Sequence, residues 1–299
     1  MDYSKLITEN RNEVSTDLDI MDTLQAVRLF NQADREVAVA VGKAETEIAR
    51  VIDHITGAFE NGGRLIYCGA GTSGRLGVLD ASECFPTFGA GRDMVDARIA
   101  GGPAALNTAI EGAEDDPELG VADMKDAGLT GRDVLVAISA SGSAAYCNGA
   151  LKYARDAGAY TACVCCVENP SFAELCDTVI SVVVGPEVLT GSTRLRAGTA
   201  TKMVLNMLTT VSMIKAGKVY KNLMVDMIPT NKKLHDRAVR IIMMATGVTE
   251  AEAVKYLDLC GNTKQAIVCI LGSMTPQEAE EALERSHGRV REAYEKKSR

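Results

Sequence analysis

Apolar residues recur along the chain in two different periods, which mark helical and strand-like stretches. From Asp22 to about Asn61 they return every three, four or seven positions, which is the spacing of one helix face. Gly62-Gly63 ends this pattern. Residues 64–68 then form a mostly apolar run typical of a buried strand, so the chain is predicted to enter a sheet after a long helical stretch.

Similar strand-like runs follow at 133–138, 160–167 and 178–184. Helical patterns separate them, one beginning at about Arg75 and another covering about 144–157. Strands that alternate with helices indicate parallel pairing, with helices covering both faces of the sheet. The predicted fold class is therefore α/β, with a doubly wound parallel sheet.

Both ends of the chain differ from this central part. Residues 1–20 are polar and irregular, which predicts an arm that is either disordered or packed on another part of the molecule. Residues 231–299 contain several short amphipathic helices, which predicts a small all-α module. The residues that separate its helices, Ala245–Val248 and Gly261-Asn262, resemble those of a ubiquitin-associated-type three-helix fold. A plain helical cap on the sheet is the alternative. We therefore expect two domains, 1–230 and 231–299.

Composition and charge exclude several classes of partner. The chain has 299 residues, a formal net charge of −8, 4% aromatic residues and no Trp. An acidic chain with few aromatic rings is a poor match for nucleic acid, so no such partner is expected. No apolar run reaches the ~18 residues of a membrane helix, and the first residues lack the features of a signal peptide. Neither a membrane partner nor export is expected.

The cysteines and histidines do not form a metal-binding pattern. In an unexported chain of this size, the nine cysteines are expected to be free thiols. Cys163, Cys165 and Cys166 lie in an apolar run and lack the paired spacing of a zinc site, so they are interpreted as small buried residues of a strand. The three histidines are far apart and fit no catalytic arrangement. No metal is expected.

The loop after the first strand matches the glycine pattern of dinucleotide-binding proteins. Gly69, Gly71 and Gly74 have the G-x-G-x-x-G spacing, between a predicted strand and a predicted helix. Such a fold also needs an acidic residue about 20 positions later, at the end of a second strand. Asp93 and Asp96 are near that distance, but the residues around them do not resemble a strand. A nicotinamide-dependent oxidoreductase therefore stays only a minor alternative.

Hydroxyl groups at two strand–helix junctions favour a different ligand. Ser139, Ser141 and Ser143 follow the second predicted strand, and Thr72 and Ser73 belong to the first loop beside Gly71. Hydroxyls and backbone N–H groups at a helix N-terminus bind a compact dianion such as a phosphate monoester. The alternative is that these residues only cap helices. A P-loop is excluded because neither loop continues into Gly-Lys-Ser/Thr.

Two glutamates are candidates for acid–base chemistry. Glu83 lies on the helix after the first loop, and Glu114 lies in an acidic segment that is also compatible with a solvated helix end. An unbroken helix would place Glu83 ~13 Å from Gly74, which is far for a sugar held by that loop. We therefore predict that the helix breaks, or that Glu83 serves the site of a partner subunit.

Several blocks of sequence together resemble the N-acetylmuramic acid 6-phosphate etherase family over nearly the whole chain. That resemblance implies the sugar isomerase (SIS) fold for residues 1–230, a cytoplasmic homodimer, a role in recycling cell-wall sugars, and no metal or organic cofactor. It also implies that Glu83 protonates the ether oxygen and that Glu114 is the second acid/base residue. The blocks are Gly69–Gly77, Leu79–Cys84, Ile99–Gly102, Glu111–Asp115, Thr190–Arg194, Ala197–Ala200, Leu205–Leu208 and Asn222–Asp226.

The activity implied by the resemblance is that of a carbon–oxygen lyase acting on an amino sugar phosphate. It removes D-lactate from N-acetylmuramic acid 6-phosphate by elimination and then adds water, which gives N-acetylglucosamine 6-phosphate. One segment departs from the family: Ser143-Ala144-Ala145 stands where Arg-Thr-Pro is usual. Ser139 and Ser143 are instead similar to the sugar-phosphate loop of glucokinase regulatory protein. A non-catalytic sugar-phosphate-binding regulator of the same fold is therefore the alternative.

Overall fold

The computed structural model describes residues 6–229 and 231–295, and its contacts divide the chain into two compact units. The domain boundary expected between residues 230 and 231 stays a prediction, since residue 230 lies outside the described residues. The first unit is Met1–Ala81 with Arg92–Thr209, and the second is Ser82–Gly91 with Thr210–Arg299.

The first unit is built on a five-stranded sheet in the order β2-β1-β3-β4-β5. Every neighbouring pair is parallel, which confirms the predicted sheet. In register, Gly69 at the end of β1 pairs with Ile138 at the end of β3, so the two strands end level. The strands are β1 (Leu65–Gly69), β2 (Val95–Ile99), β3 (Val134–Ile138), β4 (Tyr160–Cys165) and β5 (Thr178–Ser181).

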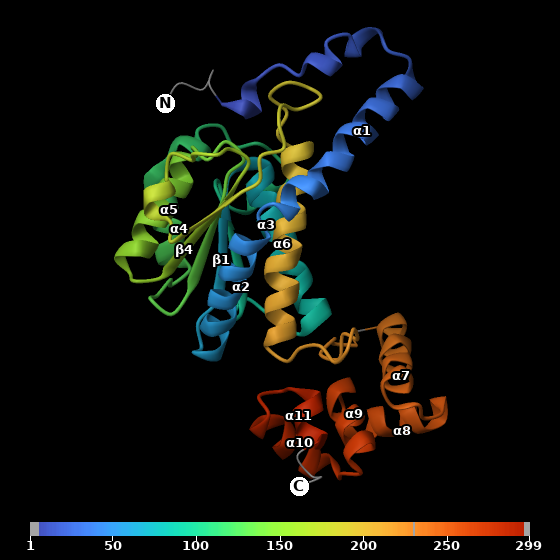
Figure 1. Cartoon of the computed structure of the whole chain (residues 1–299). Coiled ribbons are helices and arrows are strands. Elements are labelled where there is room, and N and C mark those ends of the chain that lie inside the picture. The colour runs from blue at the N-terminus through green and yellow to red at the C-terminus, as the bar shows by residue number, and fades with distance from the viewer. Residues whose placement is uncertain (1–5, 230, 296–299) are drawn as a thin grey trace. The chain divides into compact units, whose positions relative to one another are not determined.

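Helices cover both faces of this sheet, as the α/β prediction requires (Figure 1). α4 and α5 lie on one face, and α2, α3 and α6 lie on the other. The helices are α1 (Thr23–Gly42), α2 (Glu45–Glu60), α3 (Gly71–Phe88), α4 (Pro117–Asp126), α5 (Ala145–Asp156) and α6 (Arg196–Lys215).

Three details differ from the sequence prediction. The helical stretch from Asp22 to Asn61 is two helices, because α1 ends at Gly42, a residue that weakens helices. α3 begins at Gly71 rather than at about Arg75. It also runs unbroken to Phe88, so a helix break before Glu83 was a wrong expectation.

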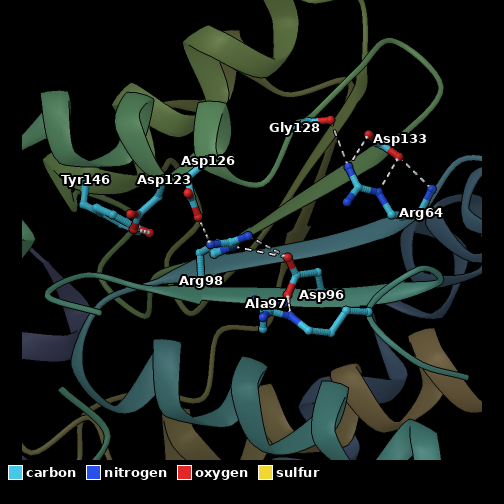
Figure 2. Close-up of polar contacts among 10 residues, drawn as sticks. Arg64, Asp96, Ala97, Arg98, Asp123, Asp126, Gly128, Asp133 and Tyr146 are labelled. Carbon is cyan, nitrogen blue, oxygen red and sulfur yellow. Dashed lines mark hydrogen bonds and ion pairs between the residues drawn. The ribbon is translucent and has the colours of Figure 1, made fainter. Parts of the chain in front are cut away.

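The edge strand β2 was missed because its sequence is polar. Asp96 and Arg98 lie within it, and they form an ion pair with an N–O distance of 3.1 Å (Figure 2). Arg92 also contacts Asp96, at 2.8 Å, and Arg98 reaches Asp126 on α4 at 2.6 Å. Charged residues are tolerated in this strand because they pair with one another, and a hydropathy pattern does not register such pairing.

The N-terminal arm is packed on the first unit rather than extended away from it. Its described residues form short 3-10 turns, of which η2 is Ile7–Glu9. Leu6 packs against Cys165 and Val167 at the end of β4. The Asn12 side chain donates a hydrogen bond to the carbonyl of Pro186 at 3.2 Å. Of the two alternatives for the arm, packing holds for the segment from Leu6 to Asn12, and residues 1–5 lie outside the described residues.

From residue 231 on, the described residues form helices joined by short connections, which confirms the predicted all-α module. α9 is its most buried helix, and Ala266, Ile267 and Val268 are fully buried. The helices are α7 (Lys232–Thr246), α8 (Glu250–Cys260), α9 (Thr263–Gly272), α10 (Pro276–Arg285) and α11 (Val290–Glu295).

The cysteines are free thiols, and those of β4 belong to the core. Cys163, Cys165 and Cys166 are at most 1% exposed. This confirms their interpretation as small buried residues, with Cys163 and Cys165 in β4 and Cys166 directly after it. No helix in residues 6–229 or 231–295 combines the length and hydropathy that a membrane span requires.

A buried carboxylate ties the beginnings of the two central strands together (Figure 2). Asp133, just before β3, accepts hydrogen bonds from the backbone N–H of Arg64 at 2.8 Å and from its guanidinium at 3.1 Å. It also accepts one from the backbone N–H of Thr130 at 2.9 Å. Burial acts to raise the pKa of Asp133, but the bonds from Arg64 and Thr130 outweigh it and hold the pKa below its ordinary value.

We predict that Asp133→Asn lowers the free energy of unfolding at pH 7 by about 2–3 kcal/mol, because the bonds to a charged acceptor are lost. Since the pKa of Asp133 is lowered by folding, its contribution is present above about pH 4 and disappears as the pH falls through that lowered pKa. Urea unfolding at pH 7 and at pH 3 measures both effects.

Asp126→Asn is the matched control, because Asp126 also pairs with an arginine but is 76% exposed. Its loss should change the unfolding free energy by at most about 1 kcal/mol. Equal effects of the two substitutions would show that Asp133 is not the tie between the strands.

Candidate functional site

A pocket of about 500 Å³ opens at the carboxyl ends of β1 and β3. Because both strands are parallel and end level, the loops that follow them meet at one edge of the sheet. Every residue that lines the pocket belongs to the first unit. The lining residues are Glu9, Ala70, Gly71, Thr72, Ser73, Leu76, Glu114, Asp115, Ile138, Ser139, Ala140, Ser141, Ser143, Ala144, Thr193, Ala197, Gly198 and Thr201.

The serines after β3 form one connected row of hydroxyls. The Oγ atoms of Ser141 and Ser143 lie 2.8 Å apart, and those of Ser139 and Ser141 lie 3.4 Å apart. The backbone fixes this loop, because the N–H of Cys166 donates to the carbonyl of Ala140 at 2.9 Å. The three predicted serines therefore face the pocket together, on a support that belongs to the sheet.

These serines do not cap the helix that follows them. The N-cap residue of α5 is Ala144, which makes no side-chain cap, and within the described part of the chain the three serine hydroxyls bond to one another. The alternative that the serines only cap a helix is therefore wrong for α5. The first N–H groups of α5 stay available at the pocket, where the helix dipole favours an anion.

The N-terminus of α6, also at the pocket, is already occupied. The buried carboxylate of Glu187 accepts hydrogen bonds from the backbone N–H groups of Arg196 and Ala197, both at 2.9 Å. A bound anion would have to compete with this carboxylate. The electrostatics of the pocket therefore favour the serine loop and α5 as the anion-binding part.

The first loop contributes Gly71, Thr72 and Ser73 to the same pocket. Gly74 is required for packing, because a Cβ at this position would lie 2.5 Å from the carbonyl oxygen of Gly69. The glycine pattern thus brings the strand and α3 close together. Asp96, the acidic residue that a dinucleotide would need, is occupied by arginines, which argues against the oxidoreductase alternative.

Glu114 lines the pocket from the 3-10 helix η6 (Ala113–Asp115). Its side chain is exposed at the mouth of the pocket. Partial burial against the pocket wall, and then the neighbouring carboxylate of Asp115, raise the pKa of Glu114 above its ordinary value. A carboxyl group whose pKa is raised by its surroundings is a candidate for acid–base chemistry.

Glu83 is placed differently from the other predicted residues. It is an exposed residue of α3 and belongs to the second unit, whereas the pocket belongs to the first. α3 is unbroken, so Glu83 lies ~13 Å along the helix from Gly74. Its role stays a prediction, and of the two explanations offered from the sequence only service to a partner subunit's site is left.

Several lining residues were not predicted from the sequence. Glu9 comes from the N-terminal arm, and Thr193, Gly198 and Thr201 come from the start of α6 and the loop before it. Thr193 and Gly198 lie in blocks that carry the family resemblance, which could have pointed to them. Glu9 lies in a segment without periodicity, so no signal in the sequence alone marks it.

The charge of the pocket is unusual for a site that would take an anion. Among the described residues that line it there is no lysine or arginine, and Glu9, Glu114 and Asp115 are acidic. A phosphate would be held by hydroxyls and backbone N–H groups. Among residues 6–229 and 231–295, no three His, Cys, Asp or Glu side chains are grouped so as to hold a metal ion.

The whole chain is similar to known proteins, and parts of it match known domain families. The chain is 50% identical to an N-acetylmuramic acid 6-phosphate etherase of Rhizobium rhizogenes over 298 residues, covering 99% of this chain and 97% of that protein. It is 49% identical to one of Aliivibrio fischeri over 294 residues, covering 98% of each. The glucokinase regulatory protein N-terminal SIS domain matches residues 47–155, and the SIS domain matches residues 116–211.

A solved structure supports the fold. A ligand complex of an E. coli CFT073 protein superposes with a TM-score of 0.50 at 16% identity, covering 68% of this chain and 97% of that one. At this identity the likeness concerns the fold alone. Together with the SIS-domain match, it confirms the predicted SIS architecture.

We predict that Asp115→Asn lowers the pKa of Glu114, because it removes a neighbouring negative charge that raises it. The titration of the Glu114 carboxyl carbon, followed by NMR on labelled protein, should move to lower pH. Glu118→Gln removes an exposed charge on α4 outside the pocket and is the control. An unchanged Glu114 titration in the Asp115 variant would contradict this account.

Proposed function

The chain belongs to the N-acetylmuramic acid 6-phosphate etherase family, and from this we propose that the pocket at the ends of β1 and β3 is where the ether bond is broken. As a member of this family the protein is a carbon–oxygen lyase, which releases D-lactate from N-acetylmuramic acid 6-phosphate. The observation that supports this location best is the row of serine hydroxyls beside the uncapped end of α5, with Glu114 in the same pocket.

The 6-phosphate binds at the serine loop in this proposal. Ser139, Ser141 and Ser143 offer hydroxyl donors, the N-terminus of α5 offers N–H groups and a favourable dipole, and Thr72 and Ser73 complete the contact from the first loop. The pocket lacks a cation among its described lining residues, so these neutral groups carry the recognition. Fixing the phosphate positions the sugar for acid–base chemistry.

The reaction needs proton transfers that two carboxyl groups supply. In the open-chain aldehyde, a base takes the C2 proton, and the electron pair of that bond forms the C2–C3 double bond. The ether oxygen leaves C3 with a proton from an acid. Water then adds its oxygen at C3, and a proton returns to C2. We assign these transfers to Glu114 and Glu83, with Glu83 as the donor to the ether oxygen, as the family resemblance implies.

Glu83 acts in the site of a partner subunit in this proposal, so the enzyme works as a homodimer. An exposed Glu83 on an unbroken helix supports this assignment. The first unit also exposes apolar side chains along α1 and the turn before it, where Ile20, Leu24 and Val27 are 78%, 56% and 57% exposed. Leu24 and Val27 are three residues apart in α1 and lie on one helix face, and Ile20 lies in the turn before the helix. Exposed apolar side chains of this kind suit burial against a second copy.

The non-catalytic regulator is the weaker proposal. The match to the glucokinase regulatory protein SIS domain covers residues 47–155, whereas the identity to etherases extends over nearly the whole chain. A binding protein would also have no need of a glutamate with a raised pKa in its pocket. We place the enzyme in the cytoplasm, in the recycling of cell-wall sugars. Its free thiols are compatible with a reducing compartment.

We predict that the purified protein releases D-lactate from N-acetylmuramic acid 6-phosphate, and that deuterium at C2 of the substrate is lost to solvent during turnover. Glu114→Gln should lower kcat by about 10²–10⁴, the usual contribution of an acid–base residue. Coupled lactate detection and mass spectrometry of the product measure these effects. A product that keeps its full label would exclude proton abstraction at C2.

A mixing experiment tests whether Glu83 acts across subunits. Glu83→Gln and Glu114→Gln proteins are each expected to be nearly inactive. Refolded together in equal amounts, half of the dimers are mixed and each mixed dimer holds one intact site, so about a quarter of wild-type activity should return. If both glutamates act within one chain, no mixed dimer has an intact site, and activity stays at the level of the single variants.

A further inference from the structure

The N-terminal arm brings a second glutamate, and a third carboxylate, into the pocket. Glu9 ends the short turn η2 and lines the same pocket as Glu114 and the serine loop. Its Oε2 atom lies 3.6 Å from the position that a Cβ on Gly191 would take. Gly191 belongs to the loop before α6, which itself contributes Thr193 to the pocket.

Contacts on both sides of Glu9 hold the arm in this place. Leu6 is 8% exposed and packs on Cys165 and Val167 at the end of β4. On the other side, Asn12 donates to the carbonyl of Pro186, in the segment that leads to α6. Figure 1 shows the arm on the same side of the sheet as the loop before α6. Glu9 is therefore positioned by the fold, since anchors lie three residues before and three residues after it.

Glu9 adds an exposed carboxylate to a pocket whose lining is already acidic. Glu9, Glu114 and Asp115 share a pocket that has no lysine or arginine among its described lining residues. Within the described part of the chain, no hydrogen bond or ion pair of the Glu9 side chain is formed. The carboxylate oxygens of Glu9 are thus open to accept hydrogen bonds from a ligand in the pocket. Uncharged donors of the ligand suit such an acceptor, because a second anionic group beside it would be repelled.

We propose that Glu9 is a substrate-binding residue that accepts hydrogen bonds from uncharged donors of the sugar, either hydroxyl groups or the acetamido N–H. This proposal rests on the assignment of the pocket to an amino sugar phosphate. The two ends of the ligand are then recognised by opposite chemistry. The serine loop and α5 donate to the phosphate, and the arm accepts from the sugar. Glu9 thus adds selectivity for a sugar phosphate over free phosphate.

The test compares the binding of three ligands to wild-type protein and Glu9→Gln by calorimetry: inorganic phosphate, glucose 6-phosphate and N-acetylglucosamine 6-phosphate. We expect the substitution to weaken binding of N-acetylglucosamine 6-phosphate about tenfold or more, since a charge-assisted hydrogen bond is lost. Binding of inorganic phosphate should stay the same or become tighter, because a negative charge has been removed. If the substitution weakens binding of glucose 6-phosphate as much as that of N-acetylglucosamine 6-phosphate, the donor is a sugar hydroxyl. If it leaves the affinity for glucose 6-phosphate unchanged, the donor is the acetamido N–H.

Glu13→Gln is the matched control, because Glu13 is an exposed glutamate of the same arm that does not line the pocket. Glu9→Ala should reproduce the loss of sugar binding, with a melting temperature like that of wild type. Unchanged affinity for both sugar phosphates in the two Glu9 variants would overturn the proposal, as would equal weakening of all three ligands. Lactate release by the wild-type enzyme tests the proposed activity separately, so the two failures are distinguishable.

Discussion

The parallel direction of all five strands is the constraint on which the site depends. It puts every strand end at one edge, so the glycine loop after β1 and the serine loop after β3 meet although about 65 residues separate them. At that edge the serine hydroxyls bond to one another instead of capping α5. The helix end consequently keeps its N–H groups for a ligand, whereas Glu187 has taken those of α6.

The lining of the pocket is divided between two kinds of groups. Hydroxyls and backbone N–H groups come from the loops after β1 and β3, and carboxylates come from the arm and from η6. Burial and Asp115 raise the pKa of Glu114 above its ordinary value. The absence of a cation among the described lining residues is compatible with this division, since a lysine near the phosphate would also neutralise the glutamates.

The sequence was informative where local pattern and final structure agree. The four apolar strands, the helices after both loops, and the hydroxyl residues of the pocket follow from periodicity and from the composition of the loops. β2 was missed because Asp96 and Arg98 pair within it, and no periodicity records a pair formed in three dimensions. Glu9 was missed for a related reason: an irregular arm gains its place from Leu6 and Asn12 contacts far along the chain. The role proposed for Glu83 depends on a second subunit, which one sequence does not contain.

Asp133 and its partners lie at the beginnings of the central strands, whereas the pocket lies at their ends. The groups that hold the sheet together are thus a strand's length away from those that contact a ligand. Loop residues such as Ser143, Ala144 and Ala145 are therefore free to diverge without loosening the scaffold. In evolutionary terms, substitutions in the pocket loops can change ligand recognition without removing the contacts that stabilise the sheet.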